Sequence, residues 1–136
     1  MKRLVIVVAV LVAACQSAPP AAPVAVAPVV SATDQRYEAS ARALLTNLTA
    51  DRYDDAVKDF DATMLAQLGP VKLREVAGQL KVQLGAFKSV GTADFSNEQG
   101  YRVVTLPALY ENARVNVRVV FDATGKIAGL FFRPAG

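Results

Sequence analysis

The fold is decided by residues 113–122, ARVNVRVVFD. Val115, Val117, Val119 and Phe121 occupy alternate positions, and mainly polar side chains stand between them. This period of two predicts a strand with one buried face and one polar face. We predict three further strands over residues 86–95, 101–110 and 126–133, which are rich in β-branched and aromatic residues. Short turn-forming segments separate the four strands, so the pattern predicts an antiparallel meander.

Before residue 85 the apolar spacing is helical. Apolar residues recur every three to four positions over residues 34–50, from about 51 to 68, and over 70–84, which predicts three helices. We expect Thr33 to cap the first helix, Pro70 to begin the third, and Gly85 to end it. Helices followed by strands predict an α+β domain over residues 34–136, with three helices packed on one face of a four-stranded sheet.

The N-terminus has the pattern of an export signal over residues 1–14. Lys2 and Arg3 precede 11 apolar residues, whereas about 20 are needed to cross a bilayer. Residues 12–15, VAAC, resemble the lipobox of bacterial lipoproteins. The resemblance implies that Cys15 is acylated and anchors the mature protein in the cell envelope, in the outer membrane if the organism has two. The alternative is an ordinary signal peptide that ends near a cysteine by chance.

A tether connects Cys15 with the domain. Residues 16–31, QSAPPAAPVAVAPVVS, contain four prolines and no charged residue, and we predict a tether over residues 15–33. The formal net charge of +3 includes Lys2 and Arg3 of the predicted signal. The mature chain is therefore close to neutral, and we expect no nucleic-acid partner.

Composition removes several kinds of chemistry. The chain has no histidine and one cysteine. Imidazole acid–base catalysis, Ser-His nucleophiles, an internal disulfide and a multi-cysteine metal site are therefore excluded. We predict neither a metal nor a cofactor.

Two segments resemble a known family. Residues 83–91, QLGAFKSVG, and residues 117–134, VRVVFDATGKIAGLFFRP, are similar to the bacterial domain of unknown function DUF3887, within the nuclear transport factor 2-like (cystatin-like) superfamily. The resemblance implies a curved sheet that wraps around the helices as a cone. Members of the family often stand alone behind an export signal or precede an α/β-hydrolase domain. The present sequence has no G-x-S-x-G motif for such a hydrolase.

Three arginines are candidates for a surface contact. Arg102, Arg114 and Arg118 lie on consecutive predicted strands and would suit phosphate or lipid headgroups. They equally fit the polar outer face of a half-buried sheet, which we favour. The superfamily resemblance implies that this outer face can also pair in a homodimer.

Tyrosines are candidates for a ligand pocket. A cone could direct Tyr53, Tyr101 or Tyr110 inward, and superfamily enzymes pair a buried tyrosine with an aspartate or histidine. No such motif transfers to this sequence, and core packing is the favoured role.

The carboxylates of Asp51, Asp55 and Asp59 would align on one helix face and could attract a hard cation, although a solvated helix face is the better interpretation.

These patterns lead to two hypotheses about function. The first is a membrane-anchored envelope lipoprotein whose non-catalytic domain binds a protein partner or a small apolar ligand, or serves as an accessory. The second is a small enzyme that acts on a hydrophobic substrate inside the cone. An enzyme needs a carboxylate with a perturbed pKa beside a phenol in a pocket, whereas a binding module needs only an apolar groove or an exposed sheet face.

Overall fold

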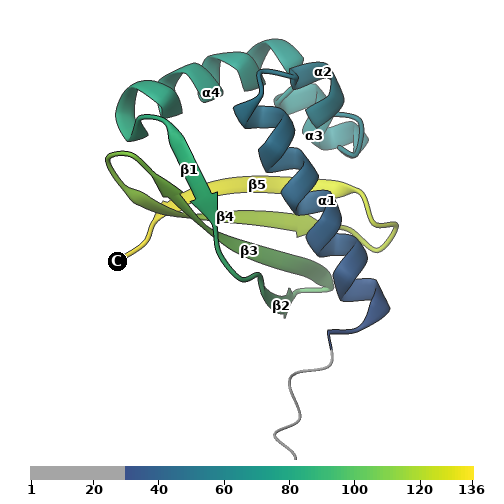
Figure 1. Cartoon of the computed structure of the whole chain (residues 1–136). Coiled ribbons are helices and arrows are strands. Elements are labelled where there is room, and N and C mark those ends of the chain that lie inside the picture. Colours follow the sequence, from purple (N-terminus) through teal and green to yellow (C-terminus); the bar gives the residue numbers. More distant parts are fainter. Residues whose placement is uncertain (1–29) are drawn as a thin grey trace, which may run out of the picture.

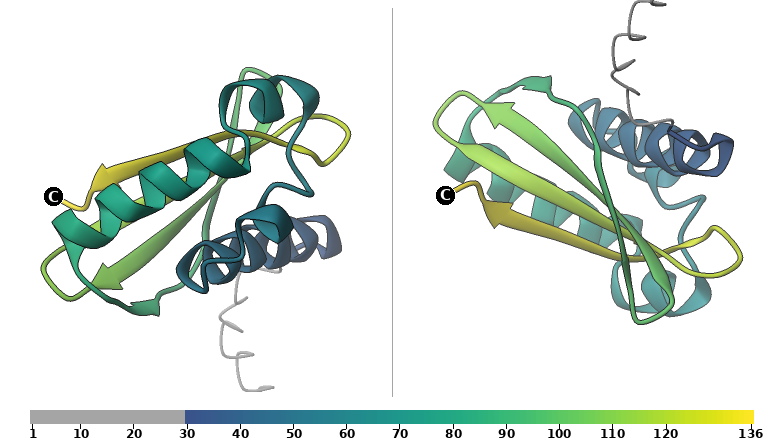
Figure 2. Two further views of the ribbon diagram at one scale, coloured as in Figure 1. Left: turned by 90° about the horizontal axis from the view of Figure 1, so that it is seen from above. Right: turned by 90° about the horizontal axis from the view of Figure 1, so that it is seen from below.

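The computed structural model describes residues 30–136. The predicted signal, Cys15 and most of the tether lie outside the described residues. The first half contains α1 (Ala32–Thr49), α2 (Tyr53–Ala56), α3 (Ala62–Gln67) and α4 (Pro70–Leu84). The second half contains β1 (Phe87–Val90), β2 (Asp94–Glu98), β3 (Tyr101–Tyr110), β4 (Arg114–Phe121) and β5 (Ile127–Pro134). The predicted α+β class is confirmed, and all helices lie on one face of the sheet (Figures 1 and 2).

The sheet is antiparallel throughout, as predicted, but it has five strands rather than four. The strand order is β1-β3-β4-β5, and β2 also pairs with β3. One edge of β3 pairs with β4, and the other is shared between β2, opposite Tyr101–Thr105, and β1, opposite Ala108–Tyr110. The long strand β3 is therefore the centre of the sheet.

The single strand predicted over residues 86–95 is wrong because the pairing with β3 is interrupted at Pro107. Proline has no amide hydrogen for the ladder. Gly91 donates its amide to the carbonyl of Pro107 at 2.7 Å, and a Cβ at Gly91 would lie 2.9 Å from the Pro107 Cγ. The carbonyl of Gly91 accepts from Arg42 of α1 at 2.9 Å. The break between β1 and β2 is thus a packed feature that ties the sheet to α1.

The second predicted helix is also two elements. The segment between α2 and α3 joins the sheet edge: Ile127 donates its amide to the carbonyl of Asp59 at 2.7 Å, and Asp61 donates to the carbonyl of Ile127 at 2.9 Å. The side chain of Asp61 then accepts from the Met64 amide at 2.6 Å and caps α3. Backbone pairing with β5 therefore prevents one continuous helix.

The other two helices agree with the prediction except at one end. Helix α4 spans the predicted Pro70–Leu84 and ends at Gly85. Helix α1 begins earlier than expected, because Ser31 rather than Thr33 is its N-cap and accepts from the Asp34 amide at 3.1 Å. No helix among residues 30–136 is long and apolar enough to span a membrane.

The core lies between the helices and the sheet. Alternate residues of β4 are buried, as predicted: Val115, Val117, Val119 and Phe121. They face buried residues of α1 and α4, including Leu45 and Leu73. The face of the sheet away from the helices carries exposed Leu109 and Phe131.

Candidate functional site

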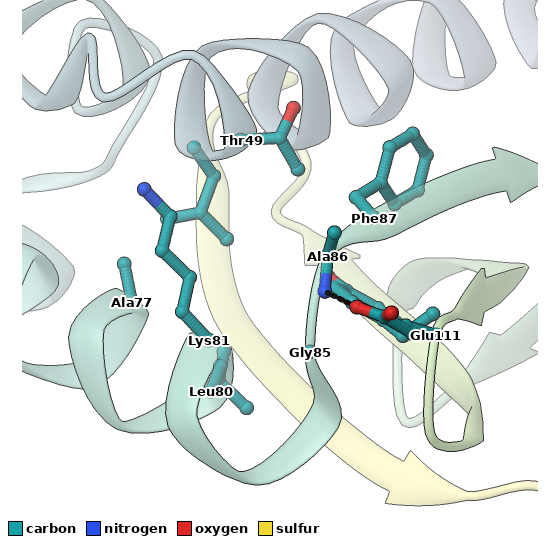
Figure 3. Close-up of a pocket in the computed structure, with 10 residues that line it drawn as sticks. Thr49, Ala77, Leu80, Lys81, Gly85, Ala86, Phe87 and Glu111 are labelled. Atoms are coloured by element: carbon teal, nitrogen blue, oxygen red, sulfur yellow. Dashed lines mark hydrogen bonds between the residues drawn. The ribbon is translucent and has the colours of Figure 1, made fainter.

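A pocket of about 690 Å³ lies at the C-terminal end of α1. Leu48 and Thr49 of α1 form one wall, and Ala77, Leu80 and Lys81 of α4 form another. The connection out of α4 and the start of β1 complete it, together with the end of β3, through Gly85, Ala86, Phe87, Tyr110 and Glu111. Figure 3 shows these side chains around the gap between the two helices and β1. Most of the lining is apolar, and the charged members are Lys81 and Glu111.

The turn at Gly85 makes one wall of the pocket. Gly85 has φ +78°, a conformation that favours glycine. A Cβ there would lie 2.8 Å from the Cβ of Glu111. Two backbone hydrogen bonds hold the same turn, from Glu111 to the carbonyl of Ala86 at 2.8 Å and from Asn112 to the carbonyl of Leu84 at 2.9 Å. The close approach fixes the β3–β4 turn against the end of α4.

Tyr110 is the only one of the three candidate tyrosines that lines this pocket. Its side chain is buried and its ring meets the Phe87 ring edge to face, with centroids 5.5 Å apart. Burial raises the pKa of the Tyr110 phenol, so it stays protonated at neutral pH.

Tyr53 is buried beside the pocket rather than in it. Its hydroxyl donates to the carboxylate of Asp51 at 2.6 Å, and the Lys81 ammonium, which lines the pocket, pairs with the same oxygen. The guanidinium of Arg74 lies 5.5 Å from the centre of the Tyr53 ring. The hydrogen bonds from Lys81 and Tyr53 hold the pKa of Asp51 below its usual value, and the hydrogen bond to Asp51 raises the pKa of Tyr53.

Sequence reasoning missed this contact between Asp51 and Lys81. Asp51 follows the C-terminal end of α1 and has φ 61°, while the Arg52 amide returns to the carbonyl of Asn47 at 2.8 Å. This is a helix-ending turn that aspartate tolerates better than most residues. The alternation of apolar residues carries no signal that would pair Asp51 with a lysine 30 positions away.

The other candidate residues lie elsewhere. Tyr101 is 44% exposed at the start of β3. Asp51, Asp55 and Asp59 do not share a helix face, because α2 has only four residues and Asp55 pairs with Lys58 instead. No cluster of three or more metal-ligating side chains occurs in the part of the chain that the structure describes.

The three arginines do not form one stripe. Directly opposed residues of antiparallel strands share a face, and Arg102 opposes the buried Phe121. Arg102 therefore lies on the helix side, where it pairs with Asp34 of α1 and its guanidinium lies 5.4 Å from the Phe95 ring centre.

Arg114 and Arg118 lie on the opposite, outer face, as favoured from the sequence. Arg118 pairs with Glu98 of β2, and Arg114 is exposed. The expected homodimer contact on this outer face stays a prediction.

The pocket lies within the part of the chain that matches a protein family. The model of the family described as "Protein of unknown function (DUF3887)" matches residues 41–130, which is more than half of the chain and includes every residue that lines the pocket. The chain belongs to DUF3887. Its α+β arrangement is thus the arrangement of a DUF3887 domain, and the matched range runs from α1 into β5.

A similar protein is Esterase EstD of Thermotoga maritima. This DUF3887 chain is 24% identical to it over 99 residues. The match covers 73% of the chain but 24% of the esterase, so the chain spans about a quarter of that relative's length. No solved structure matches the chain significantly.

Proposed function

We propose that this protein is a membrane-anchored envelope lipoprotein whose DUF3887 domain binds a small apolar ligand and performs no chemistry on it. The observation that carries the binding function is the pocket of about 690 Å³ with its mainly apolar lining. Its volume falls in the range of small-molecule sites, which combine apolar walls with a few polar groups. The wall formed by Leu48, Leu80 and Phe87 would cover an apolar ligand.

Binding of an apolar fluorophore tests this function. N-phenyl-1-naphthylamine should brighten when it enters the pocket of the wild-type chain. Ala86→Phe should weaken this binding, because the added ring occupies the pocket. Val82→Phe adds the same ring to an 84% exposed position on α4 that does not line the pocket, so it should bind like the wild type. Equal binding by both variants would contradict the proposed site.

The second candidate is the small enzyme, and the observation that favours it is the Tyr53 hydroxyl beside the Asp51 carboxylate. A general base works best when its pKa lies near the operating pH. The pKa of Asp51 is instead lowered and that of Tyr53 raised, which supports a hydrogen-bonded cluster rather than proton transfer. Turnover of a p-nitrophenyl ester that Asp51→Asn abolishes, with fluorophore binding intact, would favour the enzyme.

The anchor is tested separately. Intact mass of protein extracted from membranes should show acyl chains on a mature form that begins at Cys15. Cys15→Ser has no thiol to acylate, so it should lack this mass and leave the membrane fraction, since stable anchoring depends on the acyl chains. A wild-type mature form without acyl mass would contradict the lipoprotein proposal.

A further inference from the structure

We infer that the pocket selects a neutral amphiphile, an apolar molecule with a hydroxyl or carbonyl oxygen that hydrogen-bonds to the hydroxyl of Tyr110. This inference rests on the proposed binding function and specifies its ligand class. The inference depends on the hydrogen-bond and ion-pair partners of the polar side chains that line the pocket.

Tyr110 supplies the free polar group. The residue is only 5% exposed, and its hydroxyl makes no hydrogen bond within residues 30–136. Every fully buried side-chain nitrogen or oxygen in the described part of the chain has a partner. The Tyr110 hydroxyl must therefore remain accessible to solvent, and the pocket is the cavity that this residue lines. A ligand that displaces this solvent must replace its hydrogen bond.

The charged groups of the pocket are already engaged. The Lys81 ammonium pairs with Asp51, whose carboxylate also accepts from Tyr53. Glu111 accepts from the Ala86 amide at 3.4 Å (Figure 3). The pocket therefore offers no free cation among the described residues that line it, and its one carboxylate, that of Glu111, accepts a backbone amide but pairs with no cation there.

These contacts set the charge of the ligand. A carboxylate would compete with Asp51 for Lys81 and would lie near a second carboxylate, Glu111. A cationic headgroup would have only Glu111 to pair with, in a pocket that the Lys81 ammonium also lines. A neutral oxygen meets neither conflict, and the phenol can donate to it or accept from it.

Three ligands of equal chain length test the inference: decanol, decanoate and decylamine. Each is titrated against N-phenyl-1-naphthylamine bound to the predicted mature chain, residues 15–136, carrying Cys15→Ser, which lacks both the apolar export signal and the acylation site and so needs no detergent. Decanol should displace the fluorophore at the lowest concentration. Tyr110→Phe should weaken decanol about two- to tenfold relative to the fluorophore, the effect of one neutral hydrogen bond. Tyr101→Phe, which removes an exposed hydroxyl outside the pocket, is the matched control.

The outcomes separate the two proposals. Displacement of the fluorophore by decanoate or decylamine at a lower concentration than by decanol would overturn the neutral-ligand inference. Equal decanol affinity of wild type and Tyr110→Phe would also overturn it. In both cases, binding of the fluorophore would still support the proposed pocket. Absence of fluorophore binding by the wild type would overturn the binding function itself. If Tyr110→Phe lowers the affinities for decanol and for the fluorophore by the same factor, the loss comes from the pocket as a whole and not from the hydrogen bond, and the neutral-ligand inference is overturned.

Discussion

The hydroxyl of Tyr53 donates a 2.6 Å hydrogen bond to the carboxylate of Asp51, a residue whose backbone is left-handed with φ 61°. The contact connects the end of α1 with the buried start of α2, and Lys81 extends it to α4. Three helices thus meet at one carboxylate beside the pocket. Asp51 therefore has a backbone role and a side-chain role, which substitutions can separate.

Two substitutions of Asp51 measure the backbone role. Both Asp51→Gly and Asp51→Ala remove the carboxylate, but only alanine keeps a Cβ in the left-handed region. That Cβ costs about 1 kcal/mol, so Asp51→Ala should have the lower free energy of unfolding by about this amount. Urea denaturation measures the difference. Equal stability of the two variants would show that the turn relaxes.

The side-chain role should appear as a dependence on pH. The pKa of Asp51 is lowered in the folded protein, so its contribution to stability is present above the ordinary carboxyl pKa of about 4 and is lost as pH falls through the lower, folded pKa. Wild type should be more stable than Asp51→Asn at pH 7, and the gap should narrow towards pH 3. Urea denaturation at both pH values checks this, and a constant gap would mean that the charge of Asp51 contributes nothing.

Two glycines of one helix should respond in opposite directions to alanine. Gly78 lies inside α4 with nothing within 4 Å of a Cβ, so Gly78→Ala should raise the free energy of unfolding by about 0.5–1 kcal/mol. Gly85 ends the same helix at φ +78° against Glu111, so Gly85→Ala should lower it by about 1–3 kcal/mol. Thermal or urea unfolding measures both changes. Stabilisation by both substitutions would contradict the close packing of the turn at Gly85 against Glu111.

The arginines should separate according to their faces. Arg102→Ala removes the hydrogen bond to Asn97 Oδ1 at 3.0 Å and the contact with the Phe95 ring, and should cost about 1 kcal/mol or more. Arg114→Ala on the outer face should stay within about 0.5 kcal/mol of wild type. Similar losses from the two variants, measured by urea unfolding, would argue against the assigned faces.

Phenylalanines of the sheet provide an independent check on the same faces. Phe121 is fully buried under α1, with its ring 4.9 Å from that of Tyr37, whereas Phe131 is 50% exposed on the outer face. Phe121→Ala should cost about 3–5 kcal/mol, and Phe131→Ala less than about 1 kcal/mol. A larger loss of unfolding free energy from Phe131→Ala would mean that the outer face of the sheet is buried against another surface.

The sequence predicted elements whose signal is local and missed those that depend on distant partners. Alternation identified β4 and its faces, and Pro70 with Gly85 defined α4 to the residue. The sequence did not predict the break between β1 and β2 or the break between α2 and α3, because each depends on a residue far along the chain. Pro107 interrupts the strand pairing at Gly91, and Ile127 hydrogen-bonds to the carbonyl of Asp59. For the same reason Arg102 was placed on the outer face.

The pocket shows the same division. Tyr110 was among the candidate tyrosines, but the sequence could not distinguish it from Tyr101, because both are terminal residues of the same strand. Which of them meets a cavity depends on where α4 ends. Gly85 gave the end of that helix, but not its contact with Glu111.

Helix α1 also sets a distance. Its N-terminal end at Ser31 is where the chain leaves the domain towards the tether, and its C-terminal residues Leu48 and Thr49 belong to the pocket. Eighteen helical residues separate the two by about 27 Å, nearly the thickness of the hydrocarbon core of a bilayer. Under the proposed anchoring, a ligand would enter the pocket at the C-terminal end of α1, the end remote from the tether. Shortening the tether would bring the domain closer to the membrane without the tether itself obstructing that entrance.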